Sequence, residues 1–293
     1  MEANTWMHHT KILLSTVLFG IALALVAGPA QSSGPIEIGA DETRSESIER
    51  RNNPIRVGQS ARIEGNIENR NGAITLESGV EARDVRNRNG ATRIGDDARL
   101  GTVQSRNGGI RMGDNVRVST VENRNGSIVI GRLGETDDLK TRNGAITIGP
   151  ESRVRSVSSR NGNLDLGREV RVEAGVETRN GSIHAENGVR IGSDLITRNG
   201  GIYLVGTEVS GNVDTHGGDV TLRDGTVVSG DLIVLMPESN GGWFRQDPWQ
   251  DRAPVVRIDA DSRVEGRLII DERAKLEIDE DAETGEVERK PHR

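Results

Sequence analysis

Eight arginines at a nearly constant spacing are the residues of this chain best suited to chemistry. Each begins an Arg-Asn-Gly triplet, and successive triplets are 18 residues apart five times and 19 apart twice. If each interval is one turn of a repeating structure, the guanidinium groups form one column that can bind a row of phosphate or carboxylate groups. The eight are Arg70, Arg88, Arg106, Arg124, Arg142, Arg160, Arg179 and Arg198.

The same column has a structural interpretation. Guanidinium planes tolerate stacking and can donate to backbone carbonyls at a corner of the chain. Of the eight residues that lie two positions before these arginines, only Glu68, Glu122 and Glu177 are acidic, so pairing there is incomplete. The structural role and the binding of an acidic envelope polysaccharide therefore both stay open.

The asparagine of each triplet predicts an amide ladder. Gly accepts a positive φ, and Asn tolerates the left-handed region better than most residues, so Asn-Gly is suited to a corner. Stacked asparagine side chains can hydrogen-bond from one turn to the next. We expect this structural row at Asn71, Asn89, Asn107, Asn125, Asn143, Asn161, Asn180 and Asn199.

A weaker catalytic candidate comes from the same periodicity. Asp165, His184 and Tyr203 occupy one position of three successive repeats and would be neighbours, a grouping that can do acid–base work. The alternative is an ordinary set of cross-strand polar contacts that stabilise a sheet. Acid–base chemistry here would make the protein a polysaccharide lyase or hydrolase.

The repeat length determines the elements that position these residues. A period of 18 is too short for a helical repeat, which needs about 30 residues or more. It predicts an all-β fold, a single-stranded parallel β-solenoid with three sides and about 18 residues per coil. Ile146 and Ile148 share one face of a strand, whereas Val154 and Val157 point inward together only if a bend separates them. We expect a right-handed winding, as in parallel crossovers generally.

Composition fits a thin aliphatic core. Of the 293 residues, 33% are hydrophobic and only 2% aromatic, which is low for a globular core of this length. No cysteine is present, so disulfides and thiolate metal sites are excluded. We expect no metal site and no cofactor.

The N-terminal residues predict export. Lys11 precedes an apolar run over residues 12–27, and Gly28-Pro29-Ala30 offers a cleavage site, so residues 1–30 are expected to be a signal peptide. The alternative is an uncleaved membrane anchor, although a spanning helix needs about 20 apolar residues. Cleavage would place the protein in the periplasm, at the cell surface or outside the cell. Residues 31–50 are expected to be a flexible lead-in.

The regular solenoid is expected over residues 51–236. An insertion follows at 237–254 and contains Trp243, Phe244 and Trp249, which could stack on sugars or dock a partner, or could form a cap over the coil edge. Terminal coils are predicted over 255–278, followed by a charged disordered tail over 279–293.

Charge is distributed unevenly. Residues 51–205 hold 24 Lys and Arg against 19 Asp and Glu, a balance of +5, while residues 206–293 hold 11 against 20, a balance of −9. This asymmetry could favour head-to-tail contact with another copy or binding of an anionic partner, or it could simply maintain solubility. Nucleic acid is not expected as a partner, because the chain is acidic overall and lacks lysine clusters with interleaved aromatics.

Two stretches resemble known families. Val264-Glu265-Gly266-Arg267-Leu268 and Val228-Ser229-Gly230-Asp231-Leu232 resemble coils of the polymer-forming bactofilins. The coils that follow the Asn-Gly pairs are similar to adhesin-type solenoid domains of bacterial envelope proteins. These resemblances imply a non-enzymatic scaffold or surface role. The expected function is thus an exported structural, self-assembling or adhesin-like envelope protein, and the alternative is a binding module for anionic polysaccharide.

Overall fold

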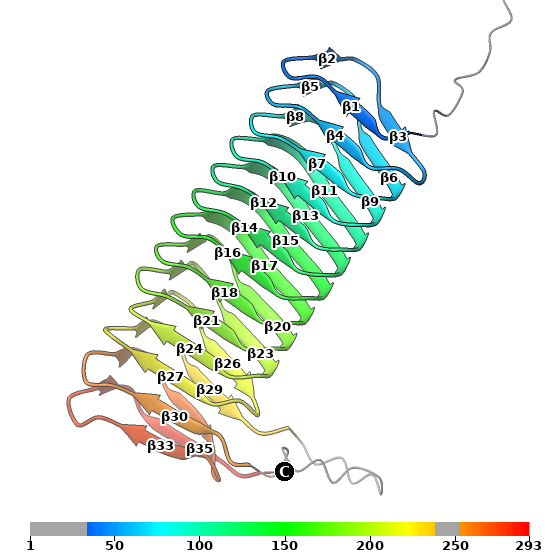
Figure 1. The fold of residues 1–293 in the computed structure, drawn as a ribbon. Coiled ribbons are helices and arrows are strands. Elements are labelled where there is room, and N and C mark those ends of the chain that lie inside the picture. Colours follow the sequence, from blue (N-terminus) through cyan, green and yellow to red (C-terminus); the bar gives the residue numbers. More distant parts are fainter. Residues whose placement is uncertain (1–33, 238–251, 293) are drawn as a thin grey trace, which may run out of the picture. The chain divides into compact units, whose positions relative to one another are not determined.

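Successive coils of the chain lie directly on one another in a parallel β-solenoid. The computed structural model describes residues 34–237 and 252–292, and these contain 35 strands in 13 coils and no helix (Figure 1). The register confirms the repeat, since Thr92 pairs with Ile110 and Ile110 with Ile128, each 18 residues further on. The predicted fold class is therefore correct. The described part of the chain has no helix long and apolar enough to cross a membrane.

Each coil places one short strand in a first ladder, which forms a 13-stranded parallel sheet. Its strands are β1 (Ile36–Ile38), β4 (Ile55–Val57), β7 (Ile74–Leu76), β10 (Thr92–Ile94), β12 (Ile110–Met112), β14 (Ile128–Ile130), β16 (Ile146–Ile148), β18 (Leu164–Leu166), β21 (Ile183–Ala185), β24 (Ile202–Val205), β27 (Val220–Arg223), β30 (Val255–Ile258) and β33 (Lys275–Ile278).

The other two sides of the coils form a second and a third ladder. In the second ladder lie β2 (Thr43–Arg44), β5 (Arg62–Ile63), β8 (Glu81–Ala82), β19 (Arg171–Val172), β22 (Arg190–Ile191), β25 (Glu208–Val209), β28 (Val227–Val228), β31 (Arg263–Val264) and β34 (Glu283–Thr284). In the third lie β3 (Ile48–Arg50), β6 (Ile67–Asn71), β9 (Val85–Asn89), β20 (Val176–Asn180), β23 (Leu195–Asn199), β26 (Val213–His216), β29 (Leu232–Leu235), β32 (Leu268–Asp271) and β35 (Val287–Lys290). In four central coils one long strand runs through both ladders: β11 (Arg99–Asn107), β13 (Arg117–Asn125), β15 (Glu135–Asn143) and β17 (Arg153–Asn161).

The core is a column of aliphatic side chains from all three ladders. Ile146 and Ile148 are buried while Thr147 between them is exposed, as the alternation of a strand requires. Val154 and Val157 are both buried, and the two residues between them point outward. The bend predicted from their spacing of three is therefore present, inside β17.

The corner after eleven of the 13 first-ladder strands contains a residue in the left-handed region. Coils of this type turn tightly, and Gly, Asn and Asp adopt positive φ most readily. The non-glycine residues at this position are Asp41, Ser60, Asp97, Asn115, Leu133, Glu151, Glu169 and Asp224, with φ between 54° and 61°. Gly79, Gly188 and Gly206 occupy it in three other coils.

The corner after the third ladder is formed by the Asn-Gly pairs, and the glycine is required there for lack of space. A Cβ on Gly108 would lie 2.1 Å from the carbonyl oxygen of Gly90 in the preceding coil, and φ of Gly108 is +139°. No side chain fits between coils that approach this closely.

Two predicted boundaries are wrong. The expected flexible lead-in over residues 31–50 contains β1, β2 and β3, because Ile38 and Ile48 are buried and complete the first coil. The expected disordered tail over residues 279–293 contains β34 and β35, whose residue Val287 pairs with Leu268. Composition marks both segments as polar, but a coil needs only a few inward residues. The predicted signal peptide over residues 1–30 lies outside the described residues.

Candidate anion-binding site

The eight arginines of the Arg-Asn-Gly triplets form one exposed column on the third ladder, here called the Arg column. Each is the penultimate residue of its strand, and the residue before it is buried, so the arginine faces solvent. Register is kept along the ladder, since Asn107 pairs with Asn125 and Asn125 with Asn143. Successive guanidinium groups are therefore attached at the strand spacing of about 4.8 Å.

The Arg column lacks internal charge compensation. Within the described residues, none of its eight guanidinium groups forms an ion pair or a hydrogen bond. The predicted structural role, capping of corner carbonyls by arginine, is therefore not seen in this part of the chain. The positive charges therefore stand at the surface without a partner among residues 34–237 and 252–292.

Several stacked arginines on the second ladder, by contrast, are paired with glutamate. On the second ladder, Glu135 lies between Arg117 and Arg153 in adjacent coils, with closest N–O distances of 2.8 and 3.8 Å. Glu81 lies in the same way between Arg62 and Arg99, at 3.1 and 3.9 Å. Interleaved glutamates thus compensate part of that column, although among the described residues Arg171 has no ion pair, and the Arg column has no such glutamates there.

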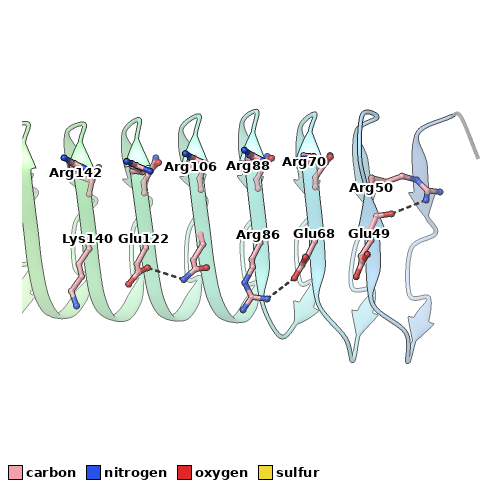
Figure 2. A pocket seen from close by; sticks show the side chains of 17 residues that line it. Glu49, Arg50, Glu68, Arg70, Arg86, Arg88, Arg106, Glu122, Lys140 and Arg142 are labelled. Atoms are coloured by element: carbon pink, nitrogen blue, oxygen red, sulfur yellow. Dashed lines mark hydrogen bonds and ion pairs between the residues drawn. The ribbon is translucent and has the colours of Figure 1, made fainter. Parts of the chain in front are cut away.

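The Arg column is the common wall of two long surface grooves. One, of about 980 Å³, lies between the arginines and the asparagine row and extends from Arg70 to Asn199; we call it the Arg–Asn groove. The other, of about 900 Å³, lies between the arginines and the residues two positions before them, from Glu49 to Arg142; we call it the mixed groove (Figure 2). Both run along the coil stack and are open to solvent.

Two of the three acids of the mixed groove, Glu68 and Glu122, are already engaged with their own column. Glu68 accepts a hydrogen bond from Arg86 at 3.0 Å, and this bond is the main reason that the pKa of Arg86 is raised. Glu122 accepts one from Gln104 at 3.2 Å. Figure 2 shows Glu68, Arg86 and Glu122 in a row separate from Arg70, Arg88, Arg106 and Arg142. The mixed groove therefore does not neutralise the Arg column.

The asparagine row forms a continuous chain of amide hydrogen bonds. Each Nδ2 donates to the Oδ1 of the asparagine one coil earlier, at 2.6–2.9 Å, from Asn199 back to Asn52. The row is exposed, and it fixes the far wall of the Arg–Asn groove. Its members are the predicted asparagines, with Asn52 added at the N-terminal end.

A buried polar column, which our sequence interpretation missed, supports the site from inside. The residue before each arginine is Asn, Ser or Thr, and in most coils it donates to the carbonyl oxygen of the corner glycine of the preceding coil. Asn123 Nδ2, for example, lies 2.8 Å from Gly108 O, and Thr197 Oγ1 lies 2.9 Å from Gly181 O. The signal in the sequence is a small polar residue before every Arg-Asn-Gly.

The predicted catalytic candidates are neighbours but do not form a built site. Asp165 pairs with His184 and His184 with Tyr203 on the first ladder, and the two rings lie 5.1 Å apart. Among the described residues no hydrogen bond joins the three side chains. These three residues line neither the Arg–Asn groove nor the mixed groove. Nor do the described ranges contain a cluster of His, Asp and Glu suited to a metal ion.

The Arg column ends at His216, which follows Arg198 in register. His216 Nε2 lies 3.4 Å from Asp214 Oδ1. Asp214 is flanked in adjacent coils by Ile196 and Ile233. Burial raises the pKa of this carboxyl, although the nearby His216 acts in the opposite direction. The C-terminal end of the Arg column is thus followed by a histidine that lies beside a partly buried acid.

The insertion begins at the same corner as the triplets. It connects β29 with β30, and its C-terminal end is anchored by Asp219, which accepts a bond from Val255 N at 2.9 Å and pairs with Arg252 at 2.8 Å. Trp243, Phe244 and Trp249 themselves lie outside the described residues.

No protein-family model, no curated protein and no solved structure matches this chain.

Proposed function

We propose that this protein is a non-enzymatic solenoid that binds a linear anionic polymer along the Arg column, an acidic polysaccharide of the cell envelope being the expected ligand. The observation that carries the proposal is the absence of a carboxylate partner for eight exposed guanidinium groups in the described chain. The same fold pairs most of the stacked arginines on its second ladder with glutamate. The unpaired positive charge of the Arg column therefore favours the binding of an anion from outside the protein.

The shape of the site supports a polymer over a small ligand. The arginines extend over seven coil steps, about 34 Å at the strand spacing, and the grooves beside them are open along their length. A sugar unit in an extended polysaccharide is close in length to one coil step, so one carboxylate could meet each arginine. Guanidinium groups bind carboxylates in a bidentate manner, and repeated weak contacts on one chain reinforce each other.

Binding to polygalacturonate tests this proposal, with neutral dextran and a single-stranded oligonucleotide as comparison ligands. We expect binding to polygalacturonate that weakens as salt rises, because exposed charge pairs are screened, and little binding to dextran. Preference for the oligonucleotide would identify a nucleic-acid site instead. Binding that ignores salt, or equal binding to dextran, would contradict the proposal.

A matched pair of double variants locates the site. Arg106→Gln with Arg124→Gln removes two charges from the Arg column, while Arg93→Gln with Arg111→Gln removes two from adjacent exposed positions of the first ladder. We expect the first pair to weaken binding about two- to thirtyfold, the effect of two exposed ion pairs, and the second to have little effect. Equal loss in both would mean that only overall charge matters.

Self-assembly is a second candidate function, favoured by open strand edges. In the described chain β1 and β33 each pair on one side only, and exposed parallel edges can accept another copy. Both end coils are acidic, however: residues 34–50 hold five acids and two bases, and residues 272–290 hold eight and four. End-to-end stacking should therefore strengthen with salt, the opposite of polysaccharide binding, and sedimentation over a salt series separates the two.

A further inference from the structure

Inside the asparagine row, each Asn-Gly corner is held by three hydrogen bonds. At Asn143–Gly144, Asn143 Nδ2 donates to Asn125 Oδ1 at 2.8 Å, and Asn143 Oδ1 accepts from Asn161 Nδ2 at 2.7 Å. The Gly144 N–H donates to Asn161 O at 2.9 Å. The amide side chain and the following backbone nitrogen are thus both fixed.

The last corner of the row, Asn199–Gly200, keeps only one of these bonds. Asn199 Nδ2 donates to Asn180 Oδ1 at 2.7 Å. In the described chain, Asn199 Oδ1 and the Gly200 N–H have no hydrogen-bond partner. The reason lies in the next coil, where Gly217 replaces asparagine. Gly217 has no side-chain amide that could donate to Asn199 Oδ1. Its φ of +97° also differs from the extended backbone of the inner asparagines, so its carbonyl is not placed to accept from the Gly200 N–H.

This difference matters because asparagine followed by glycine is chemically labile. The backbone nitrogen of the glycine gives up its proton and bonds to the side-chain Cγ of asparagine. The Cγ–Nδ2 bond then breaks, and the amide nitrogen takes up one proton and leaves as ammonia. A five-membered succinimide forms, and water opens it to aspartate or isoaspartate. The sum is one water consumed and one ammonia released. Asparagine is among the thermolabile residues, and glycine offers no side chain to hinder the attack.

We propose that Asn199 is a site of spontaneous deamidation and the point from which the asparagine row is modified in sequence. The reaction at Asn199 requires the loss of one hydrogen bond, whereas the inner corners must lose three. Conversion of Asn199 to a carboxylate removes the donor to Asn180 Oδ1. Isoaspartate also lengthens the backbone at the carbonyl that accepts the Gly181 N–H at 3.1 Å. Asn180–Gly181 then becomes the new unprotected end.

Two further Asn-Gly pairs occur outside the asparagine row, and the first of them shows that the Asn-Gly sequence by itself does not define the unprotected corner. Asn187–Gly188 lies at a different corner, and its Gly188 N–H donates to Gly206 O at 2.8 Å. Asn240–Gly241 lies outside the described residues. The inference concerns the order within the row, and it does not depend on which ligand the Arg column binds.

The test is peptide mapping by mass spectrometry of the folded full-length chain incubated at mildly alkaline pH. Two additional hydrogen bonds at inner corners should slow the reaction, so we expect Asn199 to deamidate about thirtyfold faster than Asn143. In the chain unfolded by urea the two rates should become similar. Equal rates at Asn199 and Asn143 in the folded chain would overturn the proposal.

A variant that restores the missing partner checks the cause. Gly217→Asn places an amide one coil after Asn199; its Cβ would lie 3.2 Å from Pro237 Cδ, and asparagine tolerates positive φ. We expect Asn199 to be protected in this variant, and not in Gly217→Ala, which adds the same Cβ without an amide. Protection by both substitutions would contradict the hydrogen-bond explanation. If neither variant folds, the comparison of Asn199 with Asn143 in the native chain decides.

Discussion

Asn123 Nδ2 donates to the carbonyl oxygen of Gly108 at 2.8 Å, and this bond joins a buried side chain to the corner of the preceding coil. It links the interior of the solenoid to the Arg–Asn groove, because Gly108 directly follows Asn107 of the asparagine row. The Oδ1 atom of Asn123 is buried without a hydrogen-bond partner in the described structure. One end of this amide therefore stabilises the corner, while the other end is unsatisfied.

Substitutions at Asn123 should separate these two effects. Asn123→Ala removes the shorter of two side-chain hydrogen bonds to the Gly108 carbonyl, the other being donated by Ser105 Oγ at 3.2 Å. We therefore expect the free energy of unfolding to fall by about 0.5–1.5 kcal/mol. Asn123→Thr keeps a donor and removes the unsatisfied oxygen, as Thr197 does at the equivalent position. Its stability should equal or exceed that of the wild type in urea unfolding. A threonine variant as weak as the alanine variant would contradict this assignment.

Adjacent glycines at one corner should differ in tolerance. A Cβ at Gly108 would lie 2.1 Å from Gly90 O, whereas a Cβ at Gly109 would lie 3.6 Å from its nearest neighbour, Ser127 O. We expect Gly108→Ala to destabilise the fold by more than about 2 kcal/mol. Gly109→Ala should be neutral or slightly stabilising, since Ala73, Ala91 and Ala145 occupy this position in other coils. Thermal unfolding followed by circular dichroism measures both.

Leu133 should be a point of stored strain. Its side chain is 43% exposed, and its φ is 55°. This left-handed conformation costs most non-glycine residues about 1–2 kcal/mol. Asn115 takes the same position one coil earlier. Leu133→Asn should raise the free energy of unfolding by about 0.5–1 kcal/mol. The matched change Val129→Asn, at an outward strand position without positive φ, should not stabilise the fold.

The period, the coil architecture and the amide row could be predicted from sequence because each depends on one residue type repeated at one spacing. The free charge of the Arg column could not. It depends on whether acids in neighbouring columns reach the arginines, and Glu68 and Glu122 were counted as partial partners although they bond within their own column. The first and last coils were not predicted for another reason. Two buried residues, Ile38 and Ile48, supply the inward side chains of the first coil, although the composition of this segment is polar.

Asp214 should make stability depend on pH. Its pKa is raised in the folded state, chiefly by burial, so the folded protein holds this proton more tightly than the unfolded chain. Ionised Asp214 therefore costs stability: the cost is absent below the ordinary pKa of 3.8, grows as the pH rises toward the raised folded pKa, and is complete above it. Asp214→Asn should raise the melting temperature at neutral pH and leave it unchanged in acid. A variant less stable than the wild type at neutral pH would show that the contact with His216 dominates instead.

The arginines of the Arg column should lower the stability of the free protein, because the same charges that bind an anion repel one another. Like charges about 4.8 Å apart repel unless an anion lies between them, and no acid of the described chain serves the column. Arg106→Gln with Arg124→Gln should therefore raise the free energy of unfolding by a few tenths of a kcal/mol at low salt, with the gain lost at high salt. Arg117→Gln breaks the 2.8 Å pair with Glu135 and should give no such gain. Urea unfolding at two salt concentrations measures this, and addition of polygalacturonate should stabilise the wild type more than the double variant. Equal stabilisation of both proteins by the polymer would mean that the ligand binds elsewhere.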